Sequence, residues 1–223
     1  MKRYVVASEL GCVDDMRMTD AETYVLAGFA AGSRWMPTGR DRAGSLPRAV
    51  ATVSECLAEF LPVGRDTEPW LQPMFAPWYR TLKHAADAVR HAPPNPTTAH
   101  VLSMSLPATS AITLAAMIEK WIGDLPHPIQ INLAQPAAAP PGTVHGFEVL
   151  GFEAGRFHSW LCYRLDVQAL DSLGIRTGNA GLLTTLDDAL LVVDMATNYR
   201  GTDDGTPEDV TWFVSLITEH DID

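Results

Sequence analysis

The stretch GFEVLGFEAGRFHSWLC, residues 146–162, combines two kinds of secondary-structure signal. Its first half, Gly146–Glu153, has strand character, and two glycines within a strand suggest a bulge or a close backbone approach. From Phe157 onward, apolar residues recur at helical spacing as far as Leu170, and Gly174 predicts the end of that helix. A strand followed closely by a helix predicts a mixed α+β fold for this part of the chain.

The sequence that follows continues this mixture. Thr185–Asp188 forms a capping box with acids in the first turn, which predicts a helix beginning there. Thr206–Asp209 resembles a second helix start, but the residues after it are rich in β-branched and aromatic side chains. We therefore expect a closing strand over Val210–Thr218.

Residues 1–135 show mainly helical patterns, together with three short strand-like runs. Helix starts, glycine stops and apolar spacing predict four helices, and runs of β-formers predict the strands. The predicted helices cover residues 19–31, 45–61, 74–91 and 109–122, and the predicted strands cover 2–10, 99–106 and 128–133. The fold class expected is α+β, with a helix-rich N-terminal part packed against a mixed strand–helix C-terminal part.

An uncharged stretch rich in alanine and proline, AQPAAAPPG at residues 134–142, separates the two parts. Such a sequence extends as a semi-rigid spacer and cannot satisfy its backbone internally, so we expect it near water. The domain organisation expected is a part over 1–135, a connector over 136–142 and an acidic α+β part over 143–223.

The 223 residues are 47% hydrophobic and 19% charged, with a formal net charge of −11. Nearly all of the excess is C-terminal, because residues 136–223 hold 14 acids and 4 Lys or Arg. Such acidity repels phosphate backbones and argues against nucleic-acid binding. It is accounted for either by solubility or by a basic protein partner whose approach it speeds.

Cysteine usage and the N-terminal sequence suggest a reduced, cytoplasmic protein. The three cysteines, Cys12, Cys56 and Cys162, are odd in number, widely spaced and without a Cys-x-x-Cys pair, so no disulfide framework is expected. The apolar run near the N-terminus is too short for a signal peptide, and no apolar run in the sequence is long enough to span a membrane.

His158 and Cys162 stand four residues apart on the predicted helix and would share a face. An imidazole beside a thiol can favour a thiolate nucleophile, and with His145 the pair could instead supply metal ligands. The simpler interpretation is a hydrogen-bonded histidine and a buried, unreactive cysteine, with no metal.

Three other groups of residues are candidates for function. Glu148 and Glu153 could form a carboxylate pair, but their spacing puts them on opposite strand faces and favours ordinary surface carboxylates. An apolar pocket could be lined by Trp70, Met74 and Trp78. A contact surface for a basic partner could be formed by Asp203, Asp204, Glu208 and Asp209, whose spacing does not fit a calcium loop.

Nucleotide-binding and hydrolase motifs such as Gly-x-Gly-x-x-Gly and Gly-x-Ser-x-Gly are absent, so no cofactor is expected. The segments GFEVLGFEAGRFHSWLC (146–162) and LGIRTGNAGLL (173–183) resemble uncharacterised actinobacterial proteins, some of an immunity or toxin-neutralising type. The resemblance covers roughly residues 146–198 and implies a binding protein, without any catalytic residue.

We therefore expect a cytoplasmic, non-enzymatic binding protein with an acidic surface for a basic protein partner. The alternative is a small-molecule biosynthetic or tailoring enzyme that uses the tryptophan-lined pocket and the His158/Cys162 pair. The oligomeric state does not follow from the sequence.

Overall fold

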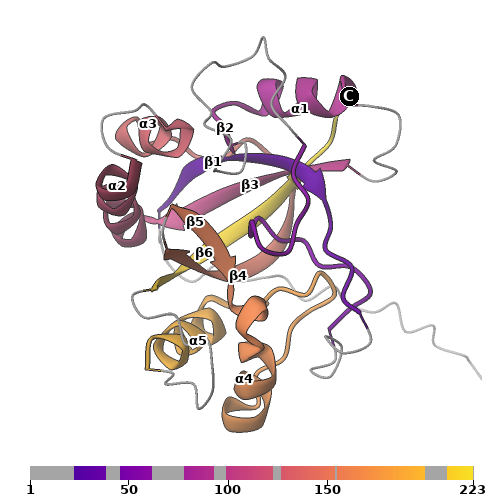
Figure 1. Cartoon of the computed structure of the whole chain (residues 1–223), viewed down its shortest axis with the longest axis vertical. Coiled ribbons are helices and arrows are strands. Elements are labelled where there is room, and N and C mark those ends of the chain that lie inside the picture. The colour runs from indigo at the N-terminus through magenta and orange to yellow at the C-terminus, as the bar shows by residue number, and fades with distance from the viewer. Residues whose placement is uncertain are drawn as a thin grey trace, which may run out of the picture.

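The structure, a computed structural model, describes residues 23–38, 46–61, 78–92, 99–122, 127–153, 155–198 and 210–222. Within these residues, six antiparallel strands form one curled sheet in the order β2-β1-β3-β6-β4-β5 (Figure 1). The strands are β1 (Tyr24–Ser33), β2 (Trp78–Tyr79), β3 (Ala99–Pro107), β4 (Thr143–Glu153), β5 (Arg156–Ser159) and β6 (Thr211–His220).

The last strand of the chain lies in the middle of the sheet. β6 pairs with β3 on one side and with β4 on the other. Its β-branched and aromatic residues fill a fully paired position, where such side chains pack well, and the expected closing strand is confirmed. Because β3 precedes the connector and β4 follows it, the N-terminal and C-terminal parts share a single hydrogen-bonded sheet.

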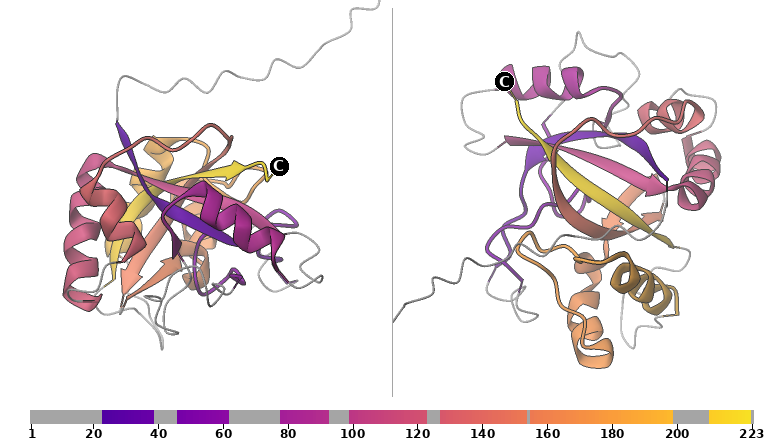
Figure 2. Two further views of the ribbon diagram at one scale, coloured as in Figure 1. Left: turned by 90° about the horizontal axis from the view of Figure 1, so that it is seen from above. Right: turned by 180° about the vertical axis from the view of Figure 1, so that it is seen from behind.

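Five α-helices and one short 3₁₀ helix surround the described part of the sheet (Figures 1 and 2). α1 packs on β1 and β3, α2 packs on α3 and β3, and α5 packs on β6 and β4. The helices are α1 (Leu82–Arg90), α2 (Ala108–Ile122), α3 (Pro128–Ala134), α4 (Leu165–Leu173), α5 (Leu186–Asn198) and the 3₁₀ helix η2 (Trp160–Tyr163).

The buried apolar side chains form two clusters. The larger one joins the sheet to α2, α3, α4 and α5, and its largest fully buried members include Trp78, Trp160 and Phe157. A smaller cluster, which contains Phe29, Tyr79 and Ala85, lies between the sheet and α1. Since helices and irregular chain cover both sheet faces, the central strands are buried almost continuously along their length.

The prediction of a helix-rich N-terminal part is wrong, because helices are interspersed with strands along the described chain. The apolar run predicted as a helix over 19–31 forms β1 from Tyr24 onward, and the predicted helix over 45–61 is irregular chain where it is described. Conversely, 128–133 forms α3 instead of a strand. A strand that is buried on both faces has no alternation of apolar and polar residues. A short apolar run therefore does not distinguish a strand from a helix.

The predicted helix from Phe157 to Gly174 is divided into three elements. β5 ends at Ser159, whose hydroxyl caps η2, and Arg164 then takes a left-handed conformation with φ 56° before α4 begins. Only the last element is an α-helix, and it ends at Gly174 as predicted, with φ 71°. The apolar spacing therefore reflects burial from several elements and not one helical face.

The connector is exposed over most of residues 136–142 and has no helix or strand. It nevertheless contacts the sheet, since the Leu26 amide donates to the Ala137 carbonyl at 2.8 Å and His220 Nδ1 lies 3.1 Å from the Pro141 carbonyl oxygen. The connector is therefore exposed, as expected, and these two contacts also hold it against β1 and β6.

Candidate functional site

Near the end of β6, the carboxylate of Glu219 receives hydrogen bonds from three basic side chains. Arg34 Nη2 and His145 Nε2 each lie 2.5 Å from Oε2, and His100 Nδ1 donates to Oε1. Arg34 follows β1, His100 lies on β3, and His145 lies at the irregularity in β4 between Val144 and Gly146. We call these four residues the Glu219 cluster.

The electrostatics of the Glu219 cluster favour an ionised carboxylate. Burial alone raises the pKa of Glu219, but hydrogen bonds from His145 and His100 and the positive charges of His100 and Arg34 outweigh it, so the pKa lies below its ordinary value. An ionised carboxylate accepts only, so each imidazole donates a ring N–H to it. The cluster thereby joins β3, β4 and β6 and orients two imidazoles.

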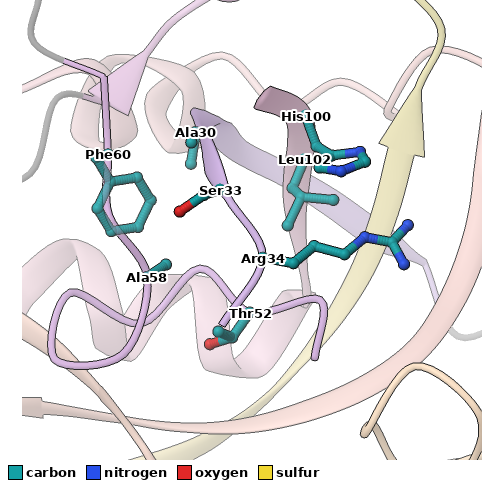
Figure 3. A pocket seen from close by; sticks show the side chains of 9 residues that line it. Ala30, Ser33, Arg34, Thr52, Ala58, Phe60, His100 and Leu102 are labelled. Carbon is teal, nitrogen blue, oxygen red and sulfur yellow. The ribbon is translucent and has the colours of Figure 1, made fainter. Parts of the chain in front are cut away.

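A small cavity adjoins this cluster (Figure 3). Arg34 and His100 lie on one side of it, and Ala58 and Phe60 lie on the other. Its volume of about 10 Å³ accommodates one water molecule and no larger ligand. The cluster therefore has the residues of an acid–base site, and the cavity that the described residues form beside it is too small for a substrate.

A second polar centre lies beneath the irregular chain of residues 46–61, at Glu148 of β4. This side chain is fully buried; Thr52 Oγ1 donates to its Oε1 at 2.5 Å and the Val53 amide to its Oε2 at 3.2 Å. Burial raises the pKa of Glu148 to about 7, although hydrogen bonds from Thr52, Val53 and Ser159 oppose the rise. The expectation of a surface carboxylate is wrong here, because chain from another part of the sequence covers it.

Cys162 is joined to Cys56 by a disulfide that spans 106 residues of sequence. Ser54 Oγ lies 3.0 Å from the sulfur of Cys56 and 3.7 Å from that of Cys162. This corrects both the expectation of reduced cysteines and that of a buried, unreactive Cys162 thiol. The alternative thiolate nucleophile has no thiol in this structure, and nothing in the spacing of the cysteines indicated the pairing.

His158 lies on β5 and not on a helix face shared with Cys162. Its Nε2 is 4.0 Å from Glu153 Oε2, and burial, only partly opposed by Glu153, lowers its pKa. The third ligand suggested for a metal, His145, belongs to the Glu219 cluster. Within the described residues, no group of histidine, cysteine or acidic side chains is arranged to hold a metal ion.

The expected apolar pocket is not formed by Trp78. Its side chain is 1% exposed and packs edge-on against Phe157, with ring centroids 5.2 Å apart, so it belongs to the core. Trp70 and Met74 lie outside the described residues, as do the four acids proposed for partner contact, Asp203, Asp204, Glu208 and Asp209.

An unusual surface occurs on α5, where two leucines and two aspartates lie together on the outer side. Leu190 and Leu191 are 50% and 52% exposed, and Asp187 and Asp194 are also exposed. At 100° per residue these four side chains fall within one arc of about 100°. We call them the α5 face; the opposite side of the helix, with Ala189 and Val192, is buried.

The surroundings of the α5 face are acidic. α4 lies next to α5 (Figure 1), with Ser172 Oγ 4.0 Å from Met195 Sδ. Together the two helices contain five aspartates and no lysine or arginine. Adjacent exposed apolar side chains with a polar rim are a feature of protein-contact surfaces.

Comparisons with known proteins identify no relative: no family model, no curated protein and no solved structure matches this chain. Among the described helices, none has the length and apolar character needed to cross a bilayer.

Proposed function

We propose that this chain is a non-enzymatic binding protein, of an immunity type, that docks a basic protein partner through the α5 face. The observation that carries the proposal is the pair of adjacent exposed leucines on α5, with an exposed aspartate before and after them in the sequence. Removing two leucine side chains from water supplies affinity. The aspartates would attract and orient a partner that carries lysine or arginine.

The charge of the sequence supports the same partner chemistry. The residues between α5 and β6 include four acids, Asp203, Asp204, Glu208 and Asp209, and one basic residue, Arg200, so this segment of the sequence has a net negative charge. A basic partner would relieve the mutual repulsion of these charges and associate faster at low salt.

Two of the residues on which the enzyme alternative depended, Cys162 and Trp78, are engaged elsewhere in the fold. Cys162 is cross-linked and Trp78 is a core residue. A cytoplasmic location is part of our proposal, and there a disulfide is uncommon unless it is transient or redox-sensing.

The test begins with capture of partners from extracts of the host cell by the immobilised protein. Leu190→Ser with Leu191→Ser should abolish retention of the partner, because both leucines lose apolar contact area. Ile112→Ser with Trp121→Ser is the matched control, since these α2 side chains are also exposed, at 75% and 50%. We expect this control to retain the partner fully.

The purified partner then allows the charge to be tested. Asp187→Asn with Asp194→Asn, and separately Asp203→Asn with Asp204→Asn, should slow association more than they speed dissociation. Raising salt from about 50 mM to about 500 mM should slow the wild-type association too, because exposed charges are screened. Retention that survives the leucine change, a partner that is not basic, or failure to retain any protein contradicts the proposal.

A further inference from the structure

Residues 46–61, here called the strap, form no helix or strand and contact β1, β5 and the chain around Ala180. Backbone hydrogen bonds hold both ends: Val50 pairs with Trp35, and the Leu61 amide donates to the Ala31 carbonyl at 2.8 Å. In the middle, the amides of Ala51 and Glu55 donate to carbonyls of Ala180 and Phe157, each at 3.0 Å. The strap is thus held by paired backbone hydrogen bonds near both ends, with Trp35 and with Ala31 and Ser33, and by further bonds that join Ser54 and Glu55 to β5.

Polar groups that would otherwise face water lie beneath the strap. Glu148 accepts hydrogen bonds from Thr52 and Val53 of the strap, in addition to one from Ser159 of β5. Thr52, Ala58 and Phe60 also form one wall of the cavity beside Arg34 and His100 (Figure 3). Movement of the strap would therefore uncover a carboxyl group and one side of the Glu219 cluster together.

In the described chain, one disulfide joins the strap to the rest of the fold, and one of its two residues is exposed. Cys56 is an exposed residue, whereas its partner Cys162 in η2 is half-buried. A reductant in solution would therefore approach the disulfide from the Cys56 side. Permanent structural disulfides in small folds are typically protected from such attack.

We propose that the Cys56–Cys162 disulfide is a reversible redox-modification site, reduced by a dithiol, that controls opening of the strap. A thiolate of the dithiol attacks the Cys56 sulfur, a mixed disulfide forms, and Cys162 leaves as a thiolate that takes up a proton. The second thiol of the reductant then attacks the mixed disulfide and releases Cys56. Two electrons pass to the protein, which gains two thiols, and the reductant becomes a cyclic disulfide. This site does not depend on the α5 face.

Native-state reduction is the first test, in a Cys12→Ser background so that only the two paired cysteines can react. The folded protein is treated with dithiothreitol, and free thiols are alkylated and counted by mass spectrometry. We expect a reduction rate proportional to reductant concentration and unchanged by low urea, as for direct attack on the folded state. A rate that rises steeply with urea means that reduction requires global unfolding, and it overturns the proposal.

Hydrogen exchange is the second test and measures the strap itself. In Cys56→Ser with Cys162→Ser, the amides of Val50, Ala51 and Glu55 should exchange about tenfold faster or more, because local opening has its own free energy. Amides of Val149 and Ile217, in the central strands, serve as the internal control and should not change. Equal acceleration of all these amides indicates general destabilisation, and no acceleration indicates a rigid strap; either result contradicts a redox-controlled opening.

Discussion

Glu148 is the single side chain whose environment departs most from its sequence context. It lies within GFEVLGFE, where its neighbours have strand character and nothing marks it as buried. It becomes buried because the strap covers β4, and the same cover provides two of its hydrogen bonds. The protonation state of Glu148 therefore depends on the position of the strap.

The stability of the protein should consequently depend on Glu148 near neutral pH. Its pKa rises from an ordinary 4.5 to about 7 on folding, so stabilisation by the protonated form is complete below 4.5 and is lost as pH rises through 7. At 1.36 kcal/mol for each pKa unit, the loss is about 3 kcal/mol. Glu148→Gln should flatten the curve of unfolding free energy against pH between 5 and 8, as measured by urea denaturation. Parallel curves for the variant and the wild type would show that Glu148 is not protonated in the folded state.

Glu219 should show the opposite dependence on pH. Its pKa is lowered on folding, so its stabilisation is present above the ordinary value of 4.5 and is lost as pH falls through the folded pKa. Glu219→Gln removes a charged acceptor from three donors and should cost about 1–3 kcal/mol at pH 7. The matched control is Glu153→Gln, whose partner His158 is 4.0 Å away, and it should cost less than about 1 kcal/mol. Equal costs for the two variants would show that the cluster adds nothing beyond a surface ion pair.

At the scale of elements, the irregularity at Gly146 determines where β4 meets both β6 and Leu183. Gly146 has φ 134°, and the next residue, Phe147, exchanges backbone hydrogen bonds with Leu183. A Cβ at Gly146 would lie 2.5 Å from the Leu183 carbonyl oxygen. The glycine that suggested a bulge in the sequence is therefore required by conformation and by space.

The Gly146→Ala variant tests this requirement. Gly174 serves as the comparison, because its positive φ favours glycine but an added Cβ there would meet no other atom. Gly174 has φ 71° but no atom within 4 Å of an added Cβ, so Gly174→Ala should cost about 1–2 kcal/mol. Gly146→Ala should cost more, since forced overlap typically adds about 1–3 kcal/mol. Urea denaturation measures both; a smaller cost at Gly146 than at Gly174 would show that β4 shifts freely.

At the scale of the whole molecule, the central position of β6 makes the two parts interdependent. A cut in the exposed connector leaves the sheet pairing of β6 with β3 and β4 intact. We expect limited proteolysis to cleave within 136–142, and the nicked fragments to co-elute in gel filtration under native, non-reducing conditions. The disulfide also joins the two fragments, so the same experiment is done with the Cys56→Ser, Cys162→Ser double variant. We expect the nicked fragments of this variant to co-elute as well. Fragments that separate and stay folded would show two independent domains.

Local signals in the sequence determined several elements of this protein by themselves. The capping threonine at Thr185, the stop at Gly174 and the β-rich run of β6 all correspond to observed boundaries, because their causes lie within a few residues. The net acidity of the C-terminal part is likewise a property of the sequence alone.

Tertiary structure alone decided β1, the strap, the burial of Glu148, the Cys56–Cys162 pair and the Glu219 cluster. β1 forms because its apolar run is covered on both faces by segments distant in the sequence, and the disulfide joins residues 106 apart. The Glu219 cluster likewise joins residues up to 185 apart, from Arg34 to Glu219. Such contacts have no local spacing or periodicity, because they depend on which strands become neighbours in the sheet.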